Sequence, residues 1–262
     1  MNLQSFRVPE KIYCKKGCLS VALEELKYIY HKQKVLIATS LDMQKQGKLK
    51  PVTDKLNELG IAYAIHDVYA GMTNAVKIFE PDCILAFYEI DCDVILAGKL
   101  LMAMDKKIYF ITVPCSVGIS SQVKPLAYDN NNNNNLADMV IIDTDLMSTN
   151  INYICWVIHA TLGTAVCACD SDDATDYSDS MAIQAIHLIF AYLPKILENP
   201  VNDYALEKLA SAGTMAGIAF SNAHASFDKS KNHARCAELL GMDLEILTKK
   251  LEAVSKLYLK FI

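Results

Sequence analysis

The densest cluster of polar side chains in the second half of the chain lies in residues 219–233, AFSNAHASFDKSKNH. His224 and Asp228 are four residues apart, and so are Lys229 and His233. On an α-helix, a spacing of four places two side chains on one face. A histidine and a carboxylate placed in this way could bind a metal ion or transfer protons. This stretch is therefore the first candidate site.

The first half of the chain contains the elements of an α/β domain. Its short apolar runs are rich in Val, Ile, Tyr and Phe, and several are continuous, as strands buried on both faces require. Strands alternating with helices predict a parallel sheet with helices on both faces, which could bind a nucleotide at the carboxyl ends of its strands. The predicted strands are Val35–Thr39, Ala62–Ile65, Cys83–Phe87, Tyr109–Val113 and Met139–Ile142, and the predicted helices are Ser20–Tyr30, Val52–Leu59 and Val94–Met104.

The second half of the chain is predicted to be all-helical. Strand patterns stop after Asp145, so we place an α/β nucleotide-type domain at residues 1–148 and an all-helical domain at 149–262. Pro194 is expected to end or kink its helix. The predicted helices are Ile154–Ala168, Tyr177–Leu193, Tyr204–Ala225, Arg235–Leu240 and Leu244–Lys260.

Composition excludes some classes of function. A net charge of −5 provides no basic surface, so nucleic acid is not an expected partner. The apolar run Ile154–Cys169 is shorter than a membrane span and includes His159, so a core helix is expected and no membrane partner. The chain starts without a secretory pattern, and its nine scattered cysteines do not form a disulfide framework. We therefore expect a cytoplasmic protein with reduced cysteines.

Two polar segments are expected to be loops. Residues 129–135, DNNNNNN, cannot bury apolar surface and predict a flexible loop. The acidic segment Asp170–Asp179 could be a calcium-binding loop, but Thr175 and Met181 stand where such a loop needs glycine and glutamate. A solvated loop whose last residues cap the next helix is the favoured interpretation.

Four segments, spread in order over nearly the whole chain, resemble the iron-type (group III) alcohol dehydrogenases, and above all the alcohol dehydrogenase half of bifunctional aldehyde–alcohol dehydrogenases. The resemblance implies a dehydroquinate synthase-like architecture, with a nucleotide-binding α/β domain and a metal-binding helical domain. It also implies interconversion of aldehydes and primary alcohols with NAD or NADP, at a bound iron or zinc. The four segments are FRVPEKIYCKKGCL (6–19), FEPDCILA (79–86), ATDYSDSMAIQAIHLIFAYLP (174–194) and SAGTMAGIAFSNA (211–223).

The family's glycine-rich phosphate turn is replaced here. The matching residues, 88–91, read Tyr-Glu-Ile-Asp, so side chains occupy space that the phosphates need and two carboxylates repel them. The expected interpretation is a rebuilt surface turn with weak dinucleotide binding.

Other cofactor positions implied by the resemblance are partly kept. Ser116 and Gly118 match the family's second turn, where Cys115 stands for a threonine and Gln122 for a glutamate. Ser40 stands where the family often has an aspartate that binds the ribose. The cofactor-binding candidates are therefore Ser40, Cys115, Ser116 and Gly118.

The family's metal ligands are missing from this chain. The resemblance implies an aspartate and a histidine four apart on one helix, followed by two later histidines. Counted from the matching segments, these positions hold Ala160, Thr164 and Lys229, and the fourth falls in a deletion near residue 234. No metal site is expected, because alanine offers no lone pair and a charged lysine repels a cation.

Several histidines lie outside the implied metal positions. His233 matches a family histidine near the nicotinamide and is the one candidate catalytic residue, although it is expected to have lost its partners. His159 is turned about 100° from the former metal position on a helix, so it is expected to be an ordinary core or surface histidine. His187, on a predicted apolar helix stripe, is interpreted in the same way.

We therefore expect a degenerate, catalytically impaired family member, whose substrate would be a small aldehyde or alcohol if it were active. One alternative is a non-catalytic partner that forms homo- or hetero-oligomers with intact family members through surface exposed by deletions. Another alternative is a dehydrogenase with a relocated site at His224, Asp228 and His233.

Overall fold

The structure is a computed structural model of the chain, and it describes residues 5–70, 72–89, 108–118, 120–124, 136–227 and 232–259. The predicted helix Val94–Met104 and the asparagine run at 130–135 lie outside the described residues. The chain divides into two compact units. One comprises residues 9–116 and 125–147, and the other comprises residues 1–8, 117–124 and 148–262.

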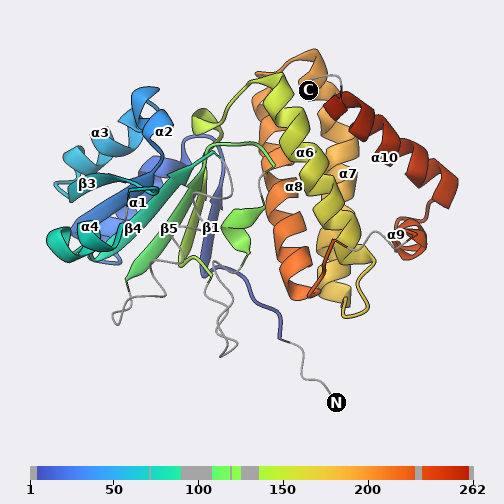
Figure 1. Ribbon diagram of the computed structural model, residues 1–262, viewed down its shortest axis with the longest axis horizontal. Helices are drawn as coiled ribbons and strands as arrows, with labels where there is room; N and C mark the ends of the chain where they lie inside the picture. Colours follow the sequence, from blue (N-terminus) through green and yellow to red (C-terminus); the bar gives the residue numbers. More distant parts are fainter. Residues whose placement is uncertain are drawn as a thin grey trace. The chain divides into compact units, whose positions relative to one another are not determined.

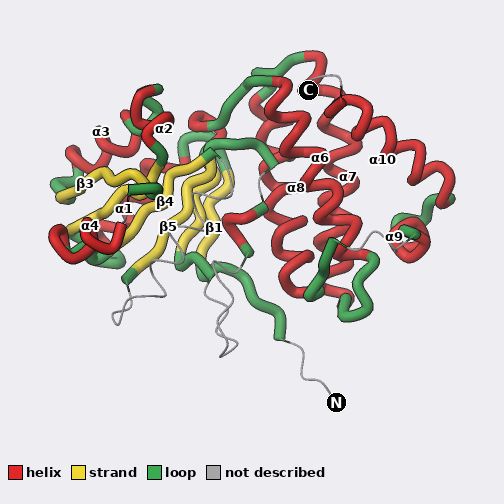
Figure 2. Tube along the Cα trace, in the orientation of Figure 1, coloured by secondary structure: helices red, strands yellow, loops and turns green. Residues whose placement is uncertain are grey.

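The first unit contains a six-stranded sheet in which every neighbouring pair is parallel, in the order β1-β6-β5-β4-β2-β3 (Figures 1 and 2). The predicted parallel sheet and all five predicted strands are confirmed. The sequence prediction missed β1, an edge strand of only four residues in which no side chain is fully buried. The strands are β1 Lys11–Cys14, β2 Lys34–Thr39, β3 Ala62–Asp67, β4 Cys83–Tyr88, β5 Tyr109–Pro114 and β6 Met139–Ile142.

Helices lie on both faces of this sheet, as predicted. Alternate strand residues such as Val35, Ile37 and Leu85 form one buried cluster with α1 (Cys18–Tyr28) and α3 (Lys50–Glu58). On the opposite face, α4 (Met72–Phe79) lies along β3. The sequence prediction missed α4 and the five-residue helix α2 (Leu41–Lys45), because neither has a long apolar stripe.

The second unit is built from helices, as the sequence predicts (Figure 1). The three long helices α6, α7 and α8 pack against one another, and α10 packs against α6. Short 3₁₀ helices lie at Ser121–Val123, in this unit, and at Thr144–Leu146, in the first. The helices are α6 Ile151–Cys169, α7 Asp176–Glu198, α8 Asp203–Asn222, α9 Ala234–Leu239 and α10 Leu244–Leu259.

The proline in α7 does not end the helix, so that part of the expectation is wrong. The helix continues past Pro194 to Glu198, and the backbone N–H of Asn199 bonds to the carbonyl of Lys195. Ile196, in this last turn, is fully buried. Burial of its side chain offsets the hydrogen bond that the proline cannot donate.

Within the helical unit, a segment that precedes the long helices in sequence packs tightly against α8. The side-chain amide of Gln122 donates to the hydroxyl of Thr214 over 3.3 Å. At Gly217, a Cβ atom would collide with the backbone carbonyl oxygen of Ser120. Residues 120–124 can therefore approach α8 only where the helix has glycine.

The N-terminal segment is also attached to α8. The side-chain amide of Asn222 donates to the carbonyl of Arg7 over 2.8 Å, and its oxygen accepts from the N–H of Arg7 over 2.6 Å. One amide thus satisfies both backbone groups of an extended residue.

Within the described residues, α6 and α7 are long and apolar enough to cross a membrane by length and composition alone. Such helices are only a weak indication, because core helices pass the same test. In α6, 56% of the apolar window is buried inside the protein, and Ile158, Leu162 and Ala165 belong to the core. The prediction of a core helix at Ile154–Cys169 agrees with this burial.

Candidate functional site

His224 does not lie on a helix, although the spacing of residues 219–233 predicts that it does. Helix α8 ends at Asn222, and His224 has a φ of 48°, in the left-handed region. His224 therefore does not share a helix face with the residue four positions later. Asp228 and Lys229 lie outside the described residues.

His233 has a partner that the sequence did not indicate. Its Nδ1 atom lies 2.6 Å from Oδ2 of Asp170. Asp170 is only 7% exposed, and its other oxygen accepts the backbone N–H of Cys236 over 3.2 Å. The carboxylate at the end of α6 therefore holds both the side chain that precedes α9 and the first turn of α9.

A second carboxylate of the acidic segment is also buried, so the interpretation of that segment as a solvated loop is wrong for both of its ends. Asp179 forms two parallel hydrogen bonds with the guanidinium of Arg235, at 2.9 and 2.6 Å. The same guanidinium donates to the carbonyl of Cys169. Asp179 raises the pKa of Arg235 further above its ordinary value, because the carboxylate stabilises the cation.

The capping role predicted for this segment is confirmed. Thr175 precedes α7, and its hydroxyl accepts from the N–H of Ser178, while the Ser178 hydroxyl accepts from the N–H of Thr175. This reciprocal pair satisfies backbone donors at the start of the helix.

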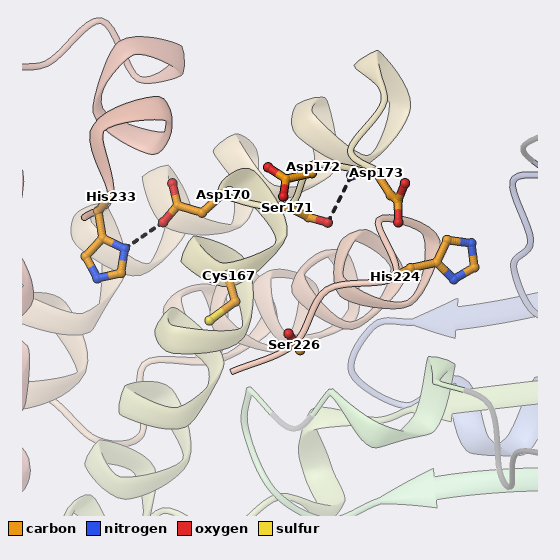
Figure 3. Close-up of a pocket in the computed structure, with 8 residues that line it drawn as sticks. All are labelled: Cys167, Asp170, Ser171, Asp172, Asp173, His224, Ser226 and His233. Carbon is orange, nitrogen blue, oxygen red and sulfur yellow. Dashed lines mark hydrogen bonds and ion pairs between the residues drawn. The ribbon is translucent and has the colours of Figure 1, made fainter. Parts of the chain in front are cut away.

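A polar cavity of about 200 Å³ opens beside the His233–Asp170 pair (Figure 3). His233 and His224 lie at opposite ends of the view in Figure 3, so the fold does not bring them together as a ligand pair. The cavity is lined by Cys167, Asp170, Ser171, Asp172, Asp173, His224, Ser226 and His233.

A second, mostly apolar cavity of about 280 Å³ lies on the face of α6 that carries Ala160 and Gly163. His233 and Cys167 line this cavity as well as the polar one. With Nδ1 bonded to a carboxylate, the imidazole of His233 has only Nε2 left for another partner. This pairing is the arrangement that general acid–base chemistry uses, so His233 stays the candidate catalytic residue.

The residues at the implied metal positions do not fit a metal ion. Ala160 is exposed and has no donor atom, and the hydroxyl of Thr164 donates to the carbonyl of Ala160 over 3.0 Å. Among the residues that the structure describes, no three His, Cys, Asp or Glu side chains converge as a ligand set. These positions therefore offer no ligand set for the family's metal ion.

His159, next to the implied ligand position, has partners of its own. Its Nε2 lies 3.1 Å from the hydroxyl of Ser255, and its ring stacks on Tyr258 with centroids 5.0 Å apart. Burial lowers the pKa of His159, because the charged form loses water. The prediction of an ordinary, satisfied histidine is confirmed.

The turn after β4 differs from the one the sequence predicts. Tyr88 belongs to the strand and is fully buried, so it is not a surface turn residue. Both carboxylate oxygens of Glu89 lie 3.2 Å from Nζ of Lys48, and the backbone carbonyl of Glu89 accepts from the Ser116 hydroxyl over 3.1 Å. The charge of Glu89 is therefore balanced by Lys48. Ile90 and Asp91 lie outside the described residues.

This ion pair lies where the strand order reverses. The chain runs from β2 outward to β3, then returns to β4 on the other side of β2. In doubly wound sheets a ligand binds outside the carboxyl ends of the strands at such a switch point. Lys48 and Glu89 therefore occupy the edge at which a nucleotide would approach β4.

The predicted cofactor residues also follow strand ends, and each has a contact within the protein. The hydroxyl of Ser40 accepts from the N–H of Met43 at the start of α2. Cys115 is fully buried, and burial raises the pKa of its thiol well above the ordinary value. Gly118 has a φ of 83°, and a Cβ there would collide with Ile158. Their assignment to a cofactor site stays a prediction.

Sequence comparison links the helical unit to a known family. The sequence model described as the Fe-containing alcohol dehydrogenase family, C-terminal, matches residues 161–239. The chain is 30% identical, over 85% of its length, to the aldehyde-alcohol dehydrogenase of Clostridium acetobutylicum, and 27% identical, over 88%, to the bifunctional aldehyde-alcohol dehydrogenase AdhE of Escherichia coli K12. It spans about a third of each of these relatives, 31% in both cases.

The fold is also similar to solved structures. The iron-containing alcohol dehydrogenase from Thermococcus thioreducens superposes with a TM-score of 0.81 and 20% identity, covering 97% of this chain and 86% of that one. The sulfoacetaldehyde reductase from Bifidobacterium kashiwanohense, solved with NAD+, superposes with a TM-score of 0.74 and 18% identity, covering 84% and 68%.

A parallel α/β sheet unit with a helical unit is the dehydroquinate synthase-like architecture of the iron-type dehydrogenases, so the predicted fold class is confirmed. The match to the family model and the aldehyde–alcohol dehydrogenase relatives agrees with this class. Residues 161–239 belong to the C-terminal part of the iron-containing alcohol dehydrogenase family, and the chain as a whole is similar to aldehyde–alcohol dehydrogenases in sequence and to iron-type dehydrogenases in fold.

Proposed function

We propose that this chain is an iron-type alcohol dehydrogenase family protein that is catalytically impaired in the family reaction, the NAD(P)-dependent interconversion of aldehydes and primary alcohols. The observation that carries the proposal is the pair Ala160 and Thr164. Where the family is expected to place an aspartate and a histidine, this chain has a methyl group and a hydroxyl bonded to the helix backbone.

The chemistry of these two residues explains the impairment. Without an ion, nothing at these positions polarises the carbonyl group of an aldehyde. The hydroxyl of Thr164, which donates to its own helix, is a poor neutral ligand, and alanine has no ligand atom in its side chain. The His233–Asp170 pair can still exchange protons, but it does not replace a Lewis acid.

The nucleotide side supports the same proposal. If NAD or NADP binds, its phosphates approach the edge that Glu89 occupies, beside Ser116. The carboxylate of Glu89 repels a phosphate group at this edge. Its ion pair also neutralises the ammonium group of Lys48, which could otherwise attract the phosphate. We also propose a cytoplasmic protein, since no two cysteines among the described residues are joined by a disulfide.

The test combines metal analysis with turnover. We expect the protein purified after growth with added iron or zinc to contain well under one equivalent of either, and to show no aldehyde-dependent oxidation of NADH or NADPH with acetaldehyde or butyraldehyde. The matched variant is Ala160→Asp with Thr164→His, which returns two donors to one helix face and should raise metal content. One tightly held equivalent of iron or zinc in the unmodified protein would refute the proposal.

A second candidate function is a non-catalytic partner of an intact family member. The observation that favours it is exposed apolar surface on the α/β unit, where Ile78 is 85% exposed and Tyr69 is 56% exposed. In size exclusion with a full-length aldehyde–alcohol dehydrogenase, the chain should then comigrate, and Ile78→Glu should weaken comigration. Val21→Glu, at an exposed position on α1, is the control. Elution as a monomer in the mixture would exclude this function.

The alternative of a relocated site at His224, Asp228 and His233 has less support. His224 lies beyond the end of α8, and His233 is bonded to Asp170. Replacement of His224 and Asp228 by alanine should leave metal content and turnover unchanged. A loss of bound metal in that double variant would revive the alternative.

A further inference from the structure

Two buried cysteines face each other between α6 and α9. Cys169 is the last residue of α6, and Cys236 lies in the first turn of α9. Both side chains are fully buried, and the Cys169 thiol is near enough to raise the pKa of the Cys236 thiol. The two thiols are 67 residues apart in sequence, so only the fold brings them together.

The contacts around the pair fix the position of α9 over the end of α6. The backbone N–H of Cys236 donates to Asp170, the residue that follows Cys169. The guanidinium of Arg235 donates to the carbonyl of Cys169 and to Asp179. Polar contacts on both sides of the thiols therefore hold them in place, and the pair is not a chance approach of two loose side chains.

We propose that Cys169 and Cys236 form a reversible covalent modification site, which closes to a disulfide when a low-molecular-weight disulfide such as oxidised glutathione is present. Closure joins α9 covalently to the C-terminal end of α6. The site is independent of the proposed impairment of the family reaction.

The reaction balances in two exchange steps. The thiolate of Cys236 attacks one sulfur of oxidised glutathione, so that a mixed disulfide forms and one glutathione thiolate leaves. The thiolate of Cys169 then attacks the Cys236 sulfur, so that the protein disulfide forms and a second glutathione leaves. The protein loses two electrons and two protons, and oxidised glutathione becomes two molecules of glutathione.

Burial makes this reaction slow in the closed state. The pKa of the Cys236 thiol is raised by its contact with Cys169 and by burial, and the thiolate is the attacking species. The reagent therefore needs α9, a helix of six residues, to open locally. Arg235 holds α9 in place through its hydrogen bonds to Asp179, so removal of the Arg235 side chain should speed the reaction.

The experiment is a time course of the full chain with oxidised glutathione, followed by acid quenching, alkylation and peptide mapping without reduction. We expect a peptide that links Cys169 to Cys236, formed more slowly than the glutathione adduct of the exposed Cys14. Arg235→Ala should form the link about tenfold faster. The linked protein should melt several degrees higher, because closing a long loop restricts the unfolded chain.

Matched variants separate this site from general oxidation. Cys236→Ser should abolish the link, whereas Cys155→Ser, at another buried cysteine of α6, should leave it unchanged. The peptide map of the unmodified protein tests the proposal even if a variant folds poorly. Separate glutathione adducts at Cys169 and Cys236 would overturn the proposal, and so would both thiols still free at the end of a time course many times longer than the full reaction of Cys14.

Discussion

The imidazole of His233 and the carboxylate of Asp170 form a hydrogen-bonded pair, with 2.6 Å between Nδ1 and Oδ2, although 63 residues separate them in sequence. The pair joins the chain at the start of α9 to the end of α6. Asp170 also accepts the N–H of Cys236, so one buried carboxylate serves two donors.

Replacing Asp170 by Asn should therefore destabilise the protein. The neutral amide cannot form the charge-assisted hydrogen bonds that the carboxylate accepts from His233 and Cys236, and their loss costs about 1–3 kcal/mol. Urea unfolding followed by circular dichroism measures this change. Asp173→Asn, at an exposed position of the same segment, should change the free energy of unfolding by less than about 0.5 kcal/mol. Equal effects of the two variants would mean that Asp170 is not held as described.

Two helix-interior glycines should respond to alanine in opposite ways. A Cβ at Gly217 meets the backbone carbonyl of Ser120, whereas a Cβ at Gly163 meets nothing within 4 Å. Gly217→Ala should lower the free energy of unfolding by about 1–3 kcal/mol, because residues 120–124 must move. Gly163→Ala should raise it by up to about 1 kcal/mol, because alanine favours the helix. Thermal melts compare the two variants directly, and stabilisation by both would show that residues 120–124 do not pack closely on α8.

Stability should depend on pH through His159. Burial lowers the pKa of its imidazole below the ordinary value of 6.5, so the unfolded chain takes up a proton at a higher pH than the folded protein does. The free energy of unfolding should then fall as the pH falls below 6.5, and the contribution is absent above that pH, where both states are neutral. His159→Gln should reduce the decrease in the free energy of unfolding between pH 7 and pH 5.

The edge of the sheet at Glu89 should control dinucleotide affinity. Glu89→Gln removes a negative charge and frees Lys48 to attract phosphate, so NADH should bind about fivefold more tightly, on the order of 1 kcal/mol for one charge pair near water. Fluorescence titration with NADH measures the gain. Glu58→Gln breaks a comparable ion pair, with Lys55 on α3, and should not change the affinity. If both variants bind NADH equally, Glu89 does not face the phosphates.

The sheet and the long helices could be predicted from sequence because their signals are local. Continuous apolar runs such as Cys83–Tyr88 are typical of strands buried on both faces, and α6 to α8 carry long apolar stripes. Strand β1 could not be found in this way. Its side chains are only partly buried, and it exists as a strand because it pairs with β6.

The candidate site could be predicted less well, because its contacts join distant parts of the chain. Nothing near Asp170 in sequence indicates that His233 and Cys236 donate to it, and nothing near Asp179 indicates Arg235. Both carboxylates lie in an acidic segment whose composition is typical of a solvated loop. The family resemblance identified the positions of Ala160 and Thr164 but not the hydrogen bond between them.

The first helix and the first strand both depend on residues near 140. Helix α1 has no side-chain cap of its own, and the N–H groups of Gly17 and Leu19 donate instead to the two carboxylate oxygens of Asp143, at 2.8 and 3.0 Å. Among the described strands, β1 pairs with β6 alone. During synthesis, the first thirty or so residues must therefore wait uncapped and unpaired until more than a hundred later ones have left the ribosome. A nascent chain halted before Asp143 should expose this segment to proteases and chaperones.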